Sequence, residues 1–278
     1  MISDTSLNTH ASPSDPQLVQ ITDPHLFGDP AARLRGVASL PALRATLELA
    51  REDLAQADAI LLTGDLVQDD AAGYAHVRDA FAPLGRPVYT IAGNHDVKAP
   101  LRATLSAPPF LLDGHHDHGA WRIVMLDSSV EGRASGELSA AELSRLEAAL
   151  AGAGGRHVLV CLHHHPVSLD SRWLDQVALQ NAADFFAVVD RHPAVRGILF
   201  GHVHQAHDSL RGDVRILGTP STCAQFLPGS DRFQVDARPP AYRHLQLRAN
   251  GAISTRLHWL AAGYASGLTA TSQNSLRA

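Results

Sequence analysis

The sequence has little cysteine and no long apolar run, and both absences limit what the protein can be. Its two cysteines, Cys161 and Cys223, lie far apart and are too few for a disulfide framework. Each falls in or beside an apolar segment, which predicts reduced, buried thiols. No apolar stretch approaches the roughly 20 residues that span a bilayer, and residues 1–16 lack the pattern of a signal peptide. We therefore expect a cytoplasmic protein that is not exported.

The chain also lacks any block of Lys or Arg, and its formal net charge is −5 over 278 residues. Nucleic acids and membrane surfaces are bound through basic patches, so neither is expected as a partner. The hydrophobic content of 45% and the charged content of 18% are ordinary for a globular protein. We expect a monomer or homodimer that acts on a small or locally recognised substrate.

Apolar runs of strand length alternate with segments whose apolar residues recur at helical spacing, which is typical of an α/β domain. The predicted buried strands cover residues 17–21, 59–62, 88–91, 121–126, 157–162 and 195–200. The predicted helices cover residues 40–55, 71–81, 140–150 and 182–189. Ser139 is the expected N-cap of the third helix, with Glu142 completing a capping box.

The pattern changes after Gly201, where shorter segments separated by turn residues resemble antiparallel strands. These segments cover residues 214–217, 233–235, 242–247 and 253–260, and we expect them to form a second sheet packed on the first. The sequence contains no internal repeat and no convincing linker. We predict a single domain over residues 17–262, with mobile tails at 1–16 and 263–278.

Polar side chains of metal-binding type follow five of the predicted strands. The carboxyl ends of strands converge at one edge of an open α/β sheet, so residues distant in sequence can meet there. The seven candidate metal ligands are Asp23, His25, Asp65, Asn94, His163, His202 and His204. They are nitrogen and oxygen donors without a thiolate, and they are enough for two ions. The set predicts a metal-dependent hydrolase that binds Fe(II) or Mn(II), with Zn(II) as an alternative.

The order and spacing of these motifs resemble the calcineurin-like metallophosphoesterase family. The motifs are Asp23-x-His25, Gly64-Asp65, Gly93-Asn94-His95-Asp96, His163-His164 and Gly201-His202-x-His204. Longer stretches at residues 20–26, 162–166, 173–176 and 220–226 are similar to the bacterial class III 3′,5′-cyclic-AMP phosphodiesterases. The resemblance implies an α/β fold, a four-layer αββα sandwich of two mixed sheets flanked by helices, with a two-metal site at its edge.

The same resemblance implies how the seven residues divide between two ions. Asp23, His25, Asp65 and His204 would bind one ion, and Asp65, Asn94, His163 and His202 the other, so that Asp65 bridges them. The site would stay positive and attract a phosphodiester anion. It would activate a metal-bridging hydroxide to attack 3′,5′-cyclic AMP, giving 5′-AMP. Substrate contacts would come from His25, Asp65, Asn94, His95, His163 and His204.

His95 is the second candidate catalytic residue beside Asp65, because it follows a ligand without being one itself. An imidazole that titrates near neutrality can stabilise the transition state or protonate the departing 3′-oxygen. Asp96 and Asp69 could each orient it. Some relatives carry an aspartate where this chain has Gln68, so the choice between them stays open.

Specificity for the nucleoside must come from outside the metal ligands. Trp173 or Phe226 could cover the base with an aromatic face, and Ser221, Thr222 or Gln225 could hydrogen-bond it. Two alternatives remain at this stage. One is a broader phosphodiesterase acting on 2′,3′-cyclic nucleotides or glycerophosphodiesters, and the other is a metal-bound regulatory protein of weak activity. Three further histidines, at 115, 116 and 118, are expected in a solvated loop.

Overall fold

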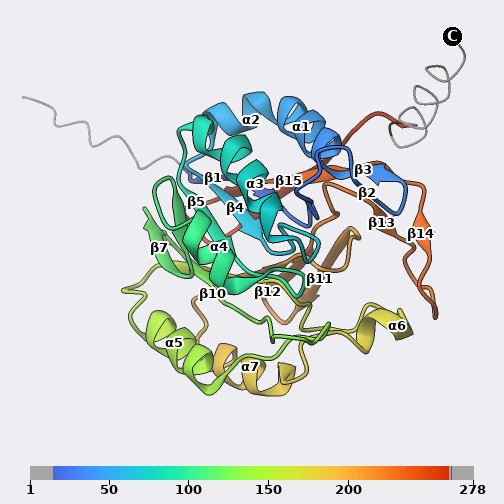
Figure 1. Cartoon of the computed structure of the whole chain (residues 1–278). Coiled ribbons are helices and arrows are strands. Elements are labelled where there is room, and N and C mark those ends of the chain that lie inside the picture. The colour runs from blue at the N-terminus through green and yellow to red at the C-terminus, as the bar shows by residue number, and fades with distance from the viewer. Residues whose placement is uncertain (1–14, 263, 265–278) are drawn as a thin grey trace, which may run out of the picture.

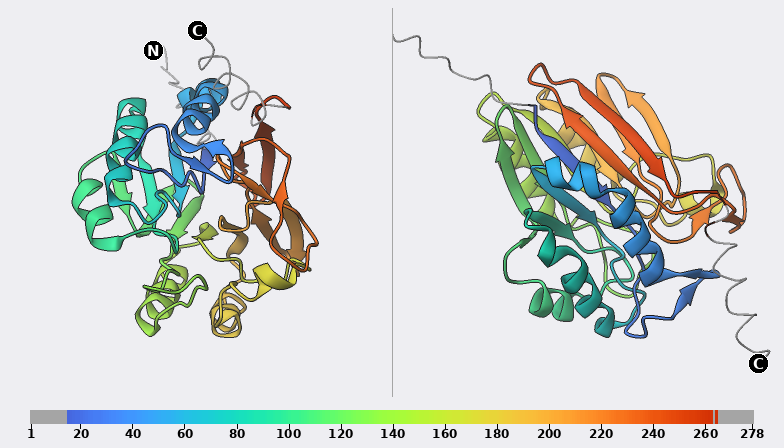
Figure 2. Two further views of the ribbon diagram at one scale, coloured as in Figure 1. Left: turned by 45° about the vertical axis from the view of Figure 1, so that its right-hand side comes forward. Right: turned by 90° about the horizontal axis from the view of Figure 1, so that it is seen from above.

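The computed structural model describes residues 15–262 and 264, and these form two six-stranded sheets packed face to face. Helices cover the outer face of each sheet, as Figures 1 and 2 show. The predicted α/β fold with two mixed sheets between helical layers is confirmed. The predicted tails lie outside the described residues except for 15, 16 and 264.

The first sheet has a parallel core with an antiparallel extension. Its strands, in spatial order, are β16 (Ile253–Trp259), β15 (Ala241–Leu247), β1 (Gln17–Ile21), β4 (Ala59–Thr63), β5 (Val88–Ile91) and β6 (Phe110–Leu112). The last four run parallel, whereas β15 is antiparallel to both of its neighbours. The helices packed on its outer face are α1 (Ser39–Leu49), α2 (Arg51–Gln56), α3 (Tyr74–Phe81) and α4 (Lys98–Thr104).

The second sheet also has four parallel strands, but it carries one antiparallel strand at each edge. Its order is β11 (His207–Arg211), β12 (Val214–Gly218), β10 (Val195–Phe200), β9 (His157–Leu162), β8 (Trp121–Met125) and β7 (Gly114–His118). Its outer helices are α5 (Ala140–Ala151) and α7 (Ala182–Val189), with the short α6 (Arg172–Asp175) nearby. Two small ribbons complete the structure: β2 (Arg33–Leu34) with β3 (Val37–Ala38), and β13 (Gln225–Phe226) with β14 (Val235–Asp236).

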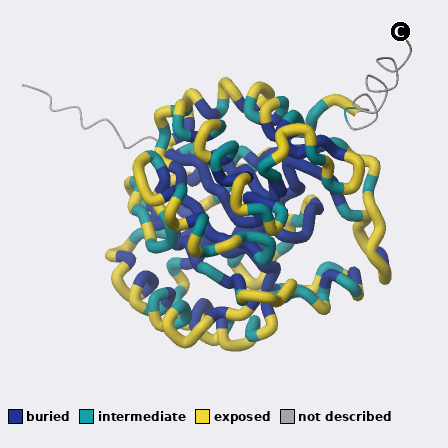
Figure 3. The backbone as a smooth tube through the Cα atoms, viewed as in Figure 1, coloured by how far each residue is buried: buried dark blue, intermediate teal, exposed yellow. Residues whose placement is uncertain are grey.

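An apolar layer between the sheets holds them together, and Figure 3 shows buried backbone running through the centre of the molecule. Because side chains alternate along a strand, Leu18 of β1 faces this layer while Val19 and Ile21 face the helices. Leu159 of β9 meets it from the second sheet. This shared layer supports the expectation of one domain, which stays a prediction.

Two predicted helices differ in detail from the structure. Residues 40–55 form two helices, because the chain bends at Ala50, where φ is −82° and ψ is 0°. Neither Gly nor Pro marks this bend, so apolar spacing gave no sign of it. Residues 71–81 begin as a 3-10 turn over Ala71–Gly73 before the α-helix starts. Ser139 does cap α5, but the Glu142 carboxylate accepts from the Asp127 backbone instead.

The expected composition of the second sheet was wrong. Strands β15 and β16 return to the first sheet beside β1, while β8, β9 and β10 belong to the second. Strands β15 and β16 have seven residues each, and their alternation identifies a buried face without identifying the neighbouring strand. The expectation of a solvated loop at the three histidines 115, 116 and 118 was also wrong, because this segment forms strand β7. There the His116 ring stacks on Tyr89 at 3.7 Å, and His118 Nε2 lies 2.6 Å from the Tyr89 hydroxyl.

Both cysteines are buried and free, as the sequence predicted. In the part of the chain that the structure describes, no helix combines the length and apolar character needed to cross a membrane.

Candidate metal centre

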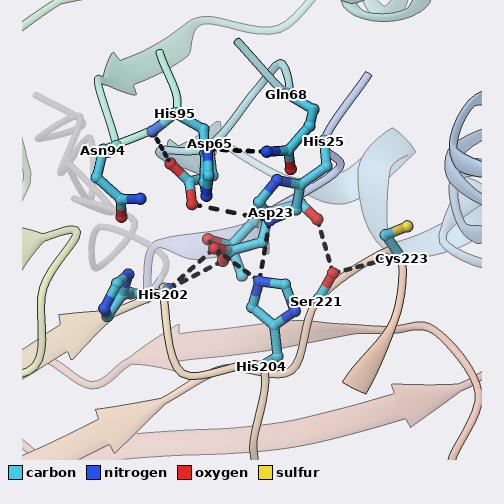
Figure 4. Close-up of polar contacts among 12 residues, drawn as sticks. Asp23, His25, Asp65, Gln68, Asn94, His95, His202, His204, Ser221 and Cys223 are labelled. Atoms are coloured by element: carbon cyan, nitrogen blue, oxygen red, sulfur yellow. Dashed lines mark hydrogen bonds and ion pairs between the residues drawn. The ribbon is translucent and has the colours of Figure 1, made fainter. Parts of the chain in front are cut away.

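The seven candidate ligands come together at the carboxyl ends of five parallel strands, and Figure 4 labels all of them except His163. Asp23 and His25 follow β1, Asp65 follows β4, and Asn94 follows β5 in the first sheet. The second sheet supplies His163 after β9, and His202 and His204 after β10. Both sheets therefore contribute to one site at the shared edge, which is where the motif order placed them.

One half of the site groups Asp23, His25, Asp65 and His204. The Nε2 atoms of His25 and His204 are 3.0 Å apart. His204 Nε2 lies 3.3 Å from Asp23 Oδ1, and His25 Nε2 lies 3.7 Å from Asp65 Oδ2. These distances between donor atoms are those of groups that can surround a common centre.

The other half of the site is built around His163. Its Nε2 lies 3.4 Å from Asp65 Oδ2 and 3.2 Å from Asn94 Oδ1. The His202 ring lies beside it, with the two ring centroids 5.0 Å apart. Since Asp65 Oδ2 approaches His25 on one side and His163 on the other, this single carboxylate lies between the two groups.

Backbone carbonyls fix the tautomers of two of these histidines. His204 Nδ1 lies 2.6 Å from the Ala224 oxygen, and His163 Nδ1 lies 2.7 Å from the Thr63 oxygen. A carbonyl only accepts, so each Nδ1 carries a hydrogen, and in the neutral form of each ring the Nε2 lone pair is directed into the centre. His202 Nε2 is buried and has no hydrogen-bond partner among the described residues. Such lone pairs suit metal ligation.

The electrostatics of the cluster favour a cation at its centre. Burial lowers the pKa of His25 to about 4 and that of His202 well below its ordinary value, so both imidazoles are neutral. Burial also opposes charge on His163, yet the adjacent Asp65 carboxylate raises the pKa of that imidazole to about 9. The space between this pair thus stabilises positive charge, and the donor set fits divalent ions.

The backbone at the site is held in an unfavourable conformation. Left-handed torsions are uncommon outside glycine and cost of order 1–3 kcal/mol, so they persist where the surrounding structure enforces them. Five of the seven candidate ligands have positive φ: Asp23 (53°), His25 (45°), Asp65 (50°), His202 (67°) and His204 (49°). Positive φ at five candidate ligands is the pattern expected where a functional site, rather than ordinary turn chemistry, holds the backbone.

Three glycines of the motifs allow the ligands to approach this closely. A Cβ on Gly93 would lie 2.2 Å from Asp65 Oδ1, and one on Gly64 would lie 2.4 Å from His163 Nδ1. At Gly201 a Cβ would meet Asp23 Oδ2 at 2.6 Å. These three glycines are therefore required by space, and Gly64 is required also by its backbone torsion, with φ of +93°.

Comparison with known proteins agrees with this geometry, since residues 16–206 match the model of the calcineurin-like phosphoesterase family. The chain belongs to this family. It is 41% identical over 250 residues to the 3′,5′-cyclic adenosine monophosphate phosphodiesterase CpdA of Pseudomonas aeruginosa, covering 89% of this chain and 91% of that protein. It is 39% identical over 251 residues to CpdA of Escherichia coli K12, covering 88% and 90%.

Solved structures share the fold at much lower identity. A dimetal phosphatase from Danio rerio superposes with a TM-score of 0.63 at 13% identity, covering 87% of this chain and 98% of that one. GAP50 of Plasmodium gives a TM-score of 0.57 at 11% identity, covering 92% and 94%. The phosphoesterase fold is thus preserved after most of the sequence has diverged.

Of the two aspartates that could orient His95, Asp69 is the one that contacts its ring. His95 Nδ1 lies 2.9 Å from Asp69 Oδ2 and 2.9 Å from Gln68 Nε2. Asp96 instead accepts from the backbone nitrogens of Gly93 and Leu66 and thereby ties two ligand loops together. The His95 backbone nitrogen donates to Asp65 Oδ1 at 2.8 Å, which fixes His95 against the proposed bridge.

Two histidines whose role the sequence left open lie beside the metal centre. The ligand-type atoms of His163, His164 and His202 lie within 4.8 Å of one another. His164 Nδ1 contacts Ser128 Oγ at 2.8 Å, and the His165 ring stacks near His202 at 5.7 Å. The run of three histidines after β9 suggested a site, but only the structure shows which neighbour each ring meets.

The aromatic residues proposed to cover the base lie on one side of the centre. The Phe226 ring stacks on His204 with centroids 4.0 Å apart, and Trp173 packs edge-on against Phe226. Phe233, which the sequence analysis missed, completes this cluster. The polar candidates are committed elsewhere, because buried Ser221 donates to the Asp23 carbonyl and buried Gln225 to the Ser221 carbonyl.

A cavity of about 580 Å³ opens on the other side of the centre, beside Asn94 and His95. It lies between the loop after β5 and the loop after β8, with Lys98, Val130 and Arg133 among its walls. A larger cavity of about 730 Å³ lies between the outer helices of the first sheet, and no candidate ligand lines it. Size alone therefore does not mark the site.

We predict that Gly64→Ala disrupts the centre much more than Gly85→Ala. Both glycines have positive φ, +93° and +65°, but a Cβ on Gly64 would clash with His163, whereas none of the described atoms lies within 4 Å of one on Gly85. Gly85→Ala should cost about 1 kcal/mol of unfolding free energy, from backbone strain alone. Gly64→Ala should cost at least twice as much in urea unfolding, and equal losses would contradict the close-approach argument.

Proposed function

We propose that this chain is a dinuclear-metal phosphodiesterase that hydrolyses 3′,5′-cyclic AMP to 5′-AMP. The observation that carries the proposal is the position of Asp65, one carboxylate between two groups of ligand-type side chains. Oδ2 of Asp65 faces both groups, so this one oxygen would be shared between two cations, while Oδ1 accepts from the His95 backbone nitrogen. The CpdA proteins, whose names specify 3′,5′-cyclic AMP, match over about nine-tenths of the chain and support the choice of substrate.

In this proposal Asp23, His25 and His204 hold one ion with Asp65, and Asn94, His163 and His202 hold the other. Two divalent ions in this position would supply an activated water and polarise the phosphoryl oxygens. The ligand chemistry favours Fe(II) or Mn(II), with Zn(II) also acceptable. We further propose that the protein works in the cytoplasm as a monomer or homodimer.

We propose that His95 protonates the departing 3′-oxygen. Its Nδ1 is turned toward Asp69, and its ring lies at the wall of the cavity beside Asn94. Hydrogen bonding to Asp69 fixes the tautomer that leaves Nε2 available to donate a proton when His95 is charged. His25, Asp65, Asn94, His163 and His204 would surround the phosphate with His95.

The nucleoside is best accommodated in the cavity of about 580 Å³. Its volume falls within the range of small-molecule sites, about 300–1,000 Å³. The aromatic cluster offers less room, because one face of Phe226 already stacks on His204. Lys98 at the cavity is paired with Asp127, so its wall is not an open cationic patch.

The substrate proposal is tested by a panel of diesters assayed with Mn(II)-loaded protein. We expect 3′,5′-cyclic AMP to be turned over with a higher kcat/KM than 2′,3′-cyclic AMP or glycerophosphocholine. Asp65→Ala should lower activity on all three by several orders of magnitude, since it removes the shared ligand. A higher kcat/KM for either of the other diesters would show that 3′,5′-cyclic AMP is not the preferred substrate. Turnover by Asp65→Ala near the wild-type value would contradict the bridging role of Asp65.

Replacing His95 should separate chemistry from metal binding. His95→Gln should retain both ions, because His95 is not a ligand, while kcat falls by roughly 10²- to 10⁴-fold. Asp69→Asn should give a smaller loss in kcat and a shifted pH profile, since Asp69 only orients the ring. Loss of an ion from His95→Gln, measured by metal analysis, would show that His95 is a ligand.

The site of the base is tested by filling the cavity. Val130→Trp should raise KM for 3′,5′-cyclic AMP by about ten-fold or more through overpacking, with little effect on methyl p-nitrophenyl phosphate, which has no base. The matched variant Phe226→Leu, on the opposite side of the centre, should change KM less. The reverse ranking would return the base to the aromatic cluster.

A further inference from the structure

A polar stripe interrupts the apolar layer between the sheets near the metal centre. Inward positions alternate along each strand, so Leu18 is followed by Gln20 on β1 and Leu61 by Thr63 on β4. On β15 the inward Leu245 is preceded by Arg243. All three polar side chains are buried, and each lies at the end of its strand nearest the candidate metal centre.

These side chains form one continuous line of hydrogen bonds, here called the Arg243–Asp23 chain. Arg243 Nε donates to Thr219 Oγ1 at 2.8 Å, and the Thr219 hydroxyl donates to Gln20 Oε1. The rest of the chain runs from Gln20 Nε2 to Thr63 Oγ1 (2.8 Å), from Thr63 Oγ1 to Thr22 Oγ1 (2.7 Å), and from Thr22 Oγ1 to Asp23 Oδ2 (2.5 Å). A buried guanidinium is thus connected to a candidate metal ligand through four intervening side chains.

The direction of every bond in the chain is set by its two ends. A guanidinium can only donate and a carboxylate can only accept. The Thr219 hydroxyl oxygen accepts from Arg243, so its hydrogen is free to be donated to Gln20 Oε1. Because Oε1 of Gln20 accepts that bond, its amide nitrogen is the atom that donates to Thr63. Each hydroxyl therefore points its hydrogen toward Asp23, and hydrogen bonds aligned in one direction polarise one another.

Arg243 itself is an unusual residue to bury. Only 2% of its surface is exposed, yet its hydrogen bonds go to neutral oxygens, those of Thr219, Thr255 and Gly218. Burial lowers the pKa of its guanidinium to about 10. Buried charges without a hydrogen-bonded carboxylate are costly, so the position of this cation calls for a role beyond packing.

The far end of the chain reaches Oδ2 of Asp23. This oxygen accepts from the Thr22 hydroxyl and, at 3.1 Å, from the His202 backbone nitrogen, whereas Oδ1 lies 3.3 Å from His204 Nε2. A side chain held at Oδ2 keeps Oδ1 directed into the centre. Groups that orient a ligand in this way commonly contribute about 10–100-fold to metal affinity.

We propose that Arg243 positions Asp23 through the Arg243–Asp23 chain and so strengthens binding of the ion held by Asp23 and His204. This proposal rests on the metal centre proposed above. Arg243 touches neither the ligands nor the substrate site, so it is a positioning residue. A purely structural Arg243 would change the stability of the fold and leave the two binding constants for metal in their wild-type ratio.

The test is equilibrium dialysis of Mn(II) against metal-free protein, which resolves two binding steps without an activity assay. Arg243→Met removes the cation, and Thr63→Val cuts the chain in its middle while conserving shape. Each should weaken one Mn(II) step by about 10–100-fold and change the other by less than about three-fold. Thr63→Val carries the test alone if Arg243→Met fails to fold.

Thr255→Val is the matched control, because Thr255 accepts from Arg243 but lies outside the chain. It should leave both Mn(II) constants within about three-fold of wild type. The double variant Arg243→Met with Thr63→Val should be no weaker than the weaker single variant, because both changes interrupt one chain. Urea unfolding of the metal-free proteins measures any separate effect on stability.

The outcomes distinguish this inference from the metal centre on which it rests. Wild-type protein that binds no Mn(II) would overturn both. Two Mn(II) steps in wild type that remain unchanged in Thr63→Val would overturn the chain alone. Losses that add in the double variant, or that Thr255→Val reproduces, would show that Arg243 acts by packing.

Discussion

The crowding of buried ligand atoms around Asp65 is the constraint on which the rest of the structure depends. Two carboxylates and four imidazoles meet there with almost no exposure to water. The Nε2 atoms of His25 and His204 lie only 3.0 Å apart, so a hydrogen or a cation must lie between them to offset the repulsion of their lone pairs. The positive φ values of five ligands and the three close-approach glycines are costs that the chain accepts to bring these groups together. Such strain persists only where other interactions offset it, and binding of metal ions at this centre would do so.

The double-sheet fold makes such crowding possible. Parallel strands end at a common edge, and packing two sheets face to face brings two such edges together. Asp65 and Asn94 come from the first sheet, and His163 and His202 from the second. The apolar layer between the sheets sets their separation, because packed interiors yield little to displacement. The geometry of the candidate metal centre therefore depends on the packing of the hydrophobic core, and the polar stripe lies at the boundary between them.

Many of the strands and all seven candidate ligands could be predicted from the sequence. The physical reasons for this also explain which predictions were wrong. Buried parallel strands give continuous apolar runs, so β1, β5, β9 and β10 matched their predicted bounds. The ligands were identifiable because each directly follows such a run. The assignment of strands to the two sheets could not be predicted, because nothing in the sequence of β15 and β16 indicates that they pair beside β1. Asp69 beside His95, Phe233 beside Phe226, and the strand at His116 likewise depend on tertiary neighbours.

The Arg243–Asp23 chain shows why buried polar residues in this layer differ from ordinary packing. Gln20 on β1, Thr63 on β4 and Thr219 directly after β12 lie where alternation would otherwise continue the apolar layer, as Leu18, Leu61 and Leu217 do two residues earlier. Apolar residues there would be cheaper to bury, because a polar group needs a partner for every donor and acceptor. With apolar residues at these positions, Asp23 Oδ2 would keep only the His202 backbone nitrogen as a donor, and the carboxylate would be held less firmly toward His204. A fully connected polar line exchanges some stability for a fixed ligand orientation, which is the property that a two-metal centre needs most.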